Sequence, residues 1–285
     1  MISVRYRIRS EREGTDMKWA AIALDLDGTL LDSGKRVSER SLNALLACRE
    51  RGVRLIVATA RPPRTVARFL PETLLRECSF AYYNGALAVC RDEPAISFAE
   101  RIPAPLSAEA IDFCLRRWPD AHLTMEADDE WFALGEADYA SAMNVVDGPT
   151  VIPLAEMKSR DATKLLLSGS FDAAAIADRF RGRLNVVVTD GGRLVQIMSP
   201  RASKEAAVAK LCAKYGFTLA DVVAFGDDFN DAGLLRDCGH GVAMGNAEEE
   251  LKRLADEVAE HHDRDGVALV LERLLREDGA GTALA

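Results

Sequence analysis

Short apolar runs alternate with amphipathic segments along the first part of the chain. Three runs are too short for helices and are typical of buried strands, namely residues 19–25, 53–58 and 80–83. Ser38 is a plausible cap for a helix over residues 39–51, and a proline pair suits the first turn of another helix over residues 64–76. This alternation predicts a parallel α/β sheet with helices on its faces.

The spacing of the apolar positions changes near residue 86. Short strands are predicted at residues 86–90, 95–98, 122–125, 131–134, 163–167, 184–189 and 194–198, with helices at 108–118 and 173–181. Asp190-Gly191-Gly192 is predicted to form a hairpin turn between the last two strands. We therefore expect residues 87–197 to form an inserted α+β domain.

The first pattern returns after this block. Helices are predicted at residues 203–215, 230–236, 247–254 and 266–276, with strands at 221–225 and 241–243. Residues 19–86 and 198–276 are thus expected to form one discontinuous, doubly wound, Rossmann-like core. Residues 1–18 are an extension that is an edge strand, a disordered arm or sequence upstream of a start at Met17, and residues 277–285 are an expected disordered tail.

Composition narrows the function classes. Hydrophobic residues make up 48% and charged residues 28% of the 285 residues, and the formal net charge is −9. An acidic chain argues against general nucleic-acid binding, and no apolar run approaches the length of a membrane span. The six cysteines are scattered without a C-x-x-C pair, which predicts reduced core residues and a cytoplasmic location.

Polar residues follow several predicted strands at the point where each strand ends. They are Asp25, Asp27, Thr59, Asn84, Asp227, Asn230 and Asp231. In open α/β sheets ligands bind outside the carboxyl ends of the strands, so we expect these side chains to meet at one edge. Neighbouring carboxylates repel unless a cation compensates, and Lys204 in the first turn of a helix is a candidate cation.

The chemistry that suits this set is phosphoryl transfer. Carboxylates with waters are the oxygen ligands of a Mg²⁺ site. One carboxylate can attack phosphorus and form an aspartyl-phosphate, while a second can protonate the leaving oxygen and then activate water. A hydroxyl and a lysine can hold the phosphoryl oxygens as charge develops on them.

Several motifs resemble those of the haloacid dehalogenase (HAD) superfamily, in order and spacing. They are Asp25-Leu26-Asp27-Gly28-Thr29-Leu30-Leu31, Thr59-Ala60-Arg61, Lys204 and Gly226-Asp227-Asp228-Phe229-Asn230-Asp231. Further runs resemble the Cof-type subfamily with a type-IIB cap, namely Asn84-Gly85-Ala86, Val242-Ala243-Met244-Gly245-Asn246-Ala247 and Asp265-Gly266-Val267-Ala268. The resemblance covers residues 19–276 and implies a HAD core with an inserted cap.

The resemblance also implies a catalytic role for each carboxylate. Asp25 would be the nucleophile and a magnesium ligand. Asp27 would be the general acid and base and would offer its backbone carbonyl to the metal. Asp227 would bind the metal directly, and Asp231 would bind it through water or support Asp227.

The remaining motif residues would hold the substrate. Thr59 and Lys204 would bind the transferring phosphoryl group, and Lys204 would also neutralise Asp25. Asn230 would orient the phosphate or Lys204. Substrate contacts are also assigned to Ala60, Arg61 and Asn84. Two positions depart from the family pattern, since Ala60 and Glu205 stand where glycines are usual. Neither change removes a catalytic atom, so we expect activity.

The function that follows is a Mg²⁺-dependent phosphatase for small phosphorylated metabolites such as sugar phosphates, acting as a monomer or homodimer. One alternative is a phosphatase specific for a sugar-phosphate conjugate such as mannosyl-3-phosphoglycerate. Alternatives of another class are a phospho-accepting domain or a binding protein that has lost catalysis. The cap is expected to select the leaving group through polar candidates at Glu126, Asp128, Asp129, Glu130, Trp131, Arg160 and Lys164.

Overall fold

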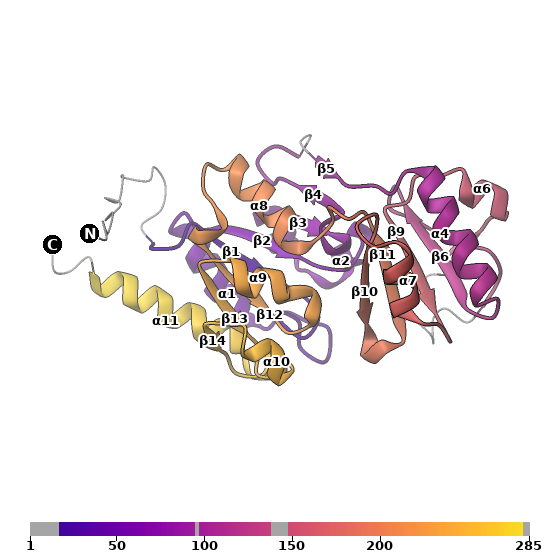
Figure 1. Ribbon diagram of the computed structural model, residues 1–285. Helices are drawn as coiled ribbons and strands as arrows, with labels where there is room; N and C mark the ends of the chain where they lie inside the picture. The colour runs from indigo at the N-terminus through magenta and orange to yellow at the C-terminus, as the bar shows by residue number, and fades with distance from the viewer. Residues whose placement is uncertain (1–16, 95–96, 138–147, 282–285) are drawn as a thin grey trace, which may run out of the picture.

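Figure 1 shows the computed structural model, which describes residues 17–94, 97–137 and 148–281. Residues 1–16 of the predicted extension, the first two residues of the strand predicted at 95–98, and residues 282–285 lie outside this description. A larger and a smaller β-sheet lie side by side, each with its own helices (Figure 1). The predicted α/β fold is confirmed.

The larger sheet has the strand order β14-β13-β12-β1-β2-β3-β4-β5. Its strands are β1 (Ala21–Leu24), β2 (Arg54–Ala58), β3 (Cys78–Tyr82), β4 (Leu87–Val89), β5 (Ser97–Ala99), β12 (Val222–Gly226), β13 (His240–Ala243) and β14 (Glu257–Val258). The strands from β14 to β3 are parallel, with Ala23 of β1 paired to Ile56 and Ala224. Strands β4 and β5 continue the sheet in the antiparallel sense.

Helices cover both faces of the larger sheet. They are α1 (Glu39–Glu50), α2 (Pro63–Phe69), α3 (Glu72–Glu77), α8 (Lys204–Lys214), α9 (Ala232–Asp237), α10 (Glu249–Lys252) and α11 (Gly266–Gly281). Successive strand residues point to opposite faces. Thus Ile22 and Leu24 pack with α1 and α11, whereas Ala21 and Ala23 pack with α8 and α9. Burial on both faces explains why β1 is continuously apolar.

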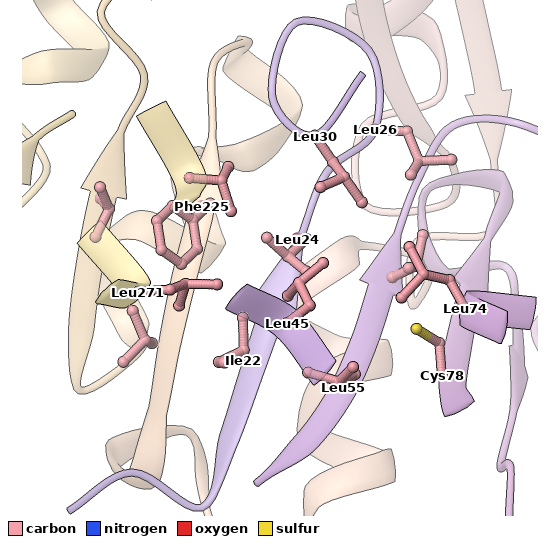
Figure 2. Close-up of a cluster of buried hydrophobic side chains, with 14 of the residues drawn as sticks. Ile22, Leu24, Leu26, Leu30, Leu45, Leu55, Leu74, Cys78, Phe225 and Leu271 are labelled. Atoms are coloured by element: carbon pink, nitrogen blue, oxygen red, sulfur yellow. The ribbon is translucent and has the colours of Figure 1, made fainter. Parts of the chain in front are cut away.

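Figure 2 shows the core on the α1 and α11 side of the sheet. Its labelled side chains include Ile22 and Leu24 of β1, Leu55 of β2, Phe225 of β12, Leu45 of α1 and Leu271 of α11. All six are almost completely inaccessible to solvent. This core holds β1 rigidly, so the carboxylates that follow β1 start from a fixed strand end.

The smaller sheet has the order β10-β11-β9-β6-β7-β8. Its strands are β6 (His122–Ala127), β7 (Glu130–Ala133), β8 (Thr150–Val151), β9 (Lys164–Ser168), β10 (Asn185–Thr189) and β11 (Leu194–Met198). Helices α4 (Ala104–Arg117) and α7 (Ala173–Arg179) pack on it through Ile111 and Ile176. The short helix α6 (Leu154–Lys158) and strand β8 were not predicted, because each is too short to show a periodic pattern.

Strands β4 and β5 belong to the larger sheet, although the sequence pattern grouped them with the inserted block. The chain turns back through the short 3₁₀ segment Tyr83–Gly85, so that Ala88 of β4 pairs with Ala81 of β3. We therefore propose that the inserted domain begins after β5 rather than at residue 87. Glu100 and Arg201, which lie in the two segments that cross between the sheets, form an ion pair of 2.6 Å.

Several helix predictions differ from the structure, and α4, for example, begins at Ala104 rather than at the predicted residue 108. The helix predicted at 64–76 is two helices, because Leu70 and Pro71 are extended and a proline interrupts helical hydrogen bonding. The last helix continues to Gly281, beyond the predicted end at residue 276. Asp278 in this extension accepts a hydrogen bond of 3.0 Å from the backbone nitrogen of Lys18, which ties the end of α11 to the segment before β1.

The composition predicted that the chain has no membrane span and that its cysteines are reduced core residues. Within them, no helix is both long enough and apolar enough to cross a membrane. All six cysteines are buried and carry free thiols.

Candidate active site

The predicted polar residues meet at the carboxyl edge of the larger sheet. Asp25 follows β1, Thr59 follows β2, Asn84 follows β3 and Asp227 follows β12. These are adjacent parallel strands, so their ends lie side by side. The smaller sheet contacts the same edge, as the hydrogen bonds described below show.

Lys204 lies between two of the carboxylates. Its Nζ donates hydrogen bonds to Asp25 Oδ1 at 2.7 Å and to Asp231 Oδ1 at 2.6 Å. The ammonium is completely buried, and although burial alone would lower its pKa, Asp231 and Asp25 raise it. Burial raises the pKa of Asp25 well above its usual range, against the opposing effect of Lys204. The lysine is thus a fixed charge beside Asp25.

Asp231 uses its second carboxylate oxygen to organise the loop after β12. Its Oδ2 accepts hydrogen bonds from the backbone nitrogens of Asp227 and Asp228, at 3.1 and 3.2 Å. Gly226 makes room for this side chain, since a Cβ there would lie 2.4 Å from the Cβ of Asp231. The motif left two roles open for Asp231, which are binding the metal through water and supporting Asp227. This geometry favours the second role.

Asp227 completes an acidic cluster. Its Oδ1 accepts a hydrogen bond of 2.7 Å from the hydroxyl of Thr29, and carboxylate oxygens of Asp25, Asp227 and Asp231 all lie within 4.8 Å of one another. Burial, reinforced by Asp231, raises the pKa of Asp227 to about 7. An all-oxygen set of clustered carboxylates fits a hard divalent cation. The motif contained Thr29, but its bond to a carboxylate 198 positions away had no sequence signal.

Asp27 stands apart from this cluster and is bound by two cations. Arg61 donates to both of its carboxylate oxygens, from Nε at 2.5 Å and from Nη2 at 2.7 Å, and Lys35 Nζ donates at 2.6 Å. Burial would raise the pKa of Asp27, but Arg61 and Lys35 outweigh it and lower the pKa. The guanidinium of Arg61 contacts Asp27 and lies over the ring of Phe69, and its contact with substrate stays a prediction. Lys35 was missed, because nothing in its local pattern marks it.

Hydrogen bonds connect the loops after β2 and β3 to each other and to Asn230, which lies in the loop after β12. Thr59 is buried, and its Oγ1 accepts a hydrogen bond of 3.2 Å from the backbone nitrogen of Arg61. Asn84 has a left-handed backbone (φ 53°), and its nitrogen donates to the carbonyl of Thr59 at 2.9 Å. Its Oδ1 accepts from Asn230 Nδ2 at 3.0 Å. The two asparagines thus connect the second and fourth motifs.

Two buried side chains of the smaller sheet reach this edge. Lys164 Nζ donates to the carbonyl of Ala60 at 3.0 Å and to Gln196 Oε1 at 3.1 Å. Asn84 Nδ2 donates to the same oxygen of Gln196 at 3.2 Å. Lys164 was a sequence candidate, whereas Gln196 was missed because it sits within the otherwise apolar strand β11.

A second set of contacts connects residues near the ends of β2 and β3 with β6 and the turn after it in the smaller sheet. Arg64 Nη2 donates to Glu126 at 2.8 Å, and Arg64 Nη1 pairs with Asp129 at 3.1 Å. The hydroxyl of Tyr83 donates to Asp129 at 3.0 Å. Burial raises the pKa of Glu126 against the opposing effects of Lys164 and Arg64. Two of the acidic cap candidates are therefore engaged by core residues, and Asp128 instead pairs with Arg101.

Glu205, which stands where the family usually has glycine, points its side chain toward α9. Its carboxylate packs against α9, where a Cβ on Gly233 would lie 2.3 Å from the carboxyl carbon. The pKa of Arg236 in α9 is raised chiefly by its hydrogen bond to Asp237, and the negative charge of Glu205 adds a smaller contribution. The position after Lys204 thus adds no contact to the acidic cluster.

Comparisons with known proteins agree with the geometry. A family model of haloacid dehalogenase-like hydrolases matches residues 22–271. The chain is 26% identical over 259 residues to the 5-amino-6-(5-phospho-D-ribitylamino)uracil phosphatase YitU of Bacillus subtilis, covering 88% of this chain and 96% of the relative. It is 31% identical over 242 residues to the HMP-PP phosphatase of Klebsiella pneumoniae, covering 81% of this chain and 85% of the relative.

A solved structure shows the same fold. The HAD subclass IIB sugar phosphatase BT4131 superposes with a TM-score of 0.75 at 20% identity, covering 89% of this chain and 98% of the other. The resemblance that the motifs indicated is confirmed. The chain therefore belongs to the haloacid dehalogenase-like hydrolases and is an enzyme of the phosphatase type within that family.

Proposed function

We propose that this protein is a Mg²⁺-dependent phosphatase that hydrolyses small phosphorylated metabolites, such as sugar phosphates, through an aspartyl-phosphate on Asp25. The observation that carries the proposal is the arrangement of buried Asp25, Lys204 and Asp231 with half-buried Asp227 at one edge of the larger sheet. Asp25 and Asp227 would hold the metal with their carboxylates, and Asp27 with its backbone carbonyl. Bound there, Mg²⁺ would neutralise charge on the phosphoryl oxygens.

Asp25 carries the first step. Its Oδ1 is held by Lys204, so we assign the attack on phosphorus to Oδ2. The new bond joins this oxygen to phosphorus while the ester bond between phosphorus and the leaving oxygen breaks. The ammonium of Lys204 and the hydroxyl of Thr59 stabilise the negative charge on the phosphoryl oxygens as it passes to Asp25.

Asp27 moves the protons in both steps. As an acid it protonates the leaving oxygen, and as a carboxylate it then takes a proton from the water that attacks the aspartyl-phosphate. That attack forms inorganic phosphate and returns Asp25 to its free form. Arg61 and Lys35 stabilise the carboxylate form, which suits the second step.

Asp27→Asn is expected to slow steady-state phosphate release by roughly 10²- to 10⁴-fold, the usual contribution of a positioned acid and base. Phosphoenzyme should accumulate, because the amide cannot take a proton from water. Phosphate release and the mass of acid-quenched protein measure the two effects. The matched control is Asp32→Asn on the same loop, where the Asp32 carboxylate accepts hydrogen bonds from Arg36 of its own turn. An unchanged rate in Asp27→Asn would contradict the assigned role.

Mg²⁺ affinity is expected to fall as the pH drops from 8 to 6. A raised carboxylate pKa means that protons compete with the metal, and metal binding releases protons. With the pKa of Asp227 at about 7, this competition weakens binding by about tenfold over that interval. Calorimetric titration of metal-free protein at both pH values measures the change, and equal affinities at pH 6 and 8 would exclude proton competition at this site.

The cap sets the leaving group in this account. Named relatives act on a phosphoribitylaminouracil and on HMP-PP, which supports a small, polar leaving group. Glu126 and Asp129 share Arg64, and Lys164 also acts on Glu126, so these two cations offset the two acidic charges between the sheets. Lys164 and Gln196 of the smaller sheet bind Ala60 and Asn84, in the loops after β2 and β3. We propose that these two side chains contact the leaving group.

Phosphate release from a panel of metabolite monoesters, with Mg²⁺ present, tests the proposal. Comparable turnover of several sugar phosphates is the expected result. Activity confined to a conjugate such as mannosyl-3-phosphoglycerate would favour the specific phosphatase instead. No release from any ester, with no Mg²⁺ effect, would favour a catalytically silent binding protein.

A further inference from the structure

The loop after β13 contacts the acidic cluster through one asparagine. Asn246 Nδ2 donates a hydrogen bond of 2.8 Å to the carbonyl of Gly28, and it lies 3.4 Å from Asp227 Oδ2. Its Oδ1 accepts a hydrogen bond of 3.1 Å from the backbone nitrogen of His262. A single amide thus joins three segments that are far apart in the sequence.

The partners of Asn246 determine how its amide is oriented. A backbone N–H can only donate, so the nitrogen of His262 requires the amide oxygen on its side. The amide nitrogen then faces Gly28 and Asp227, which offer only acceptors. His262 is itself tethered, because its Nδ1 lies 2.8 Å from the carbonyl of Leu31. The amide is therefore held by a neighbour that is fixed in turn.

Asp227 is consequently contacted on both carboxylate oxygens. Thr29 donates to Oδ1 at 2.7 Å, and Asn246 lies beside Oδ2. Gly28 closes a third side, since a Cβ at this left-handed position (φ 80°) would lie 2.1 Å from Asp227 Oδ2. The carboxylate has little freedom to rotate away from Asp25 and Asp231.

We propose that Asn246 is a positioning residue that holds Asp227 in the orientation required to bind the catalytic metal. This inference rests on the proposed function, because it assumes that Asp227 is a metal ligand. Hydrogen bonds to a ligating carboxylate orient it and tune its affinity for the metal, and their loss costs roughly 10- to 100-fold in affinity or activity. Asn246 does not contact the reacting atoms in this assignment.

Asn246→Ala is expected to weaken Mg²⁺ binding to the metal-free protein by roughly 10- to 100-fold. Isothermal titration calorimetry measures this without any turnover. In activity assays the Mg²⁺ concentration for half-activation should rise by the same factor, while kcat at saturating Mg²⁺ stays near the wild-type value. A residue that served only the fold would lower the unfolding temperature without changing the metal constant.

Asn185→Ala is the matched control, because the Asn185 amide also donates to a backbone carbonyl at 2.8 Å, that of Ala202, which precedes Lys204 by two residues and is not part of the loops that hold Asp227. It should leave Mg²⁺ binding unchanged. If Asn246→Ala does not fold, Asn246→Ser provides the second variant, since its side chain is too short to reach both Gly28 and His262.

Wild-type Mg²⁺ binding in folded Asn246→Ala or Asn246→Ser would overturn the inference, as would equal weakening in Asn185→Ala. Those results leave the proposed function standing. Wild-type protein that neither binds Mg²⁺ nor releases phosphate in its presence would overturn both.

Discussion

Asp25→Asn abolishes phosphate release, with an expected loss on the order of 10⁴-fold or more, because residual rates without a nucleophile come only from binding and charge stabilisation. An amide oxygen is a poor nucleophile and cannot form the aspartyl-phosphate. The substitution keeps the shape of the side chain. Its carbonyl oxygen can still accept the hydrogen bond from Lys204 that Asp25 accepts at 2.7 Å.

The fold of Asp25→Asn should survive. Removing the charge of Asp25 relieves the cost of burying it and the repulsion from Asp231 and Asp227, and together these outweigh the lost attraction to Lys204. We therefore expect an unfolding temperature at or above that of the wild type, measured by circular dichroism in the absence of metal. A folded Asp25→Asn protein with near wild-type phosphate release would contradict the covalent mechanism.

Lys204→Met combines the largest expected loss of stability with a loss of activity. Removing one partner from a buried ion pair costs about 3–5 kcal/mol, because the remaining charge is left uncompensated. Here two buried carboxylates, Asp25 and Asp231, lose the same cation. Activity should also disappear, since the phosphoryl group loses its fixed positive charge.

Chemical denaturation of the metal-free protein measures the change in the free energy of unfolding. Lys210→Met is the control in the same helix, since Lys210 is partly exposed and shares Glu100 with Arg201. A surface pair of this kind is worth about 0–1 kcal/mol. If Lys204→Met were as stable and as active as Lys210→Met, the assignment of Lys204 as the charge-balancing residue would be wrong.

The framework of the site could be predicted because its signals are local. An apolar strand followed at once by polar residues marks a strand end, and parallel strands bring such ends together. Asp25, Thr59, Asn84 and Asp227 all follow this rule. The capping serine of α1 was likewise visible locally, since Ser38 accepts a hydrogen bond from the nitrogen of Ser41 at 3.0 Å.

The missed contacts lie between distant segments of the chain. Asn246 stands in a quoted motif and Glu126 was a cap candidate, but their partners could not be read from the sequence. Asn246 bonds to Gly28 across 218 positions, and Glu126 bonds to Arg64 across 62. Strands β4 and β5 show the same limit, because alternation identifies a strand but not the sheet to which it pairs.

The phosphoryl group on Asp25 is the most direct test of the account. Asp27→Asn protein is mixed with a metabolite phosphate that the wild type hydrolyses, in the presence of Mg²⁺, then quenched in acid and digested for mass spectrometry. The account predicts one added phosphoryl group on the peptide that contains Asp25, located on Asp25, and its absence when EDTA replaces Mg²⁺. Phosphorylation of another residue, or wild-type turnover with no phosphorylated Asp25 at any quench time, would contradict it.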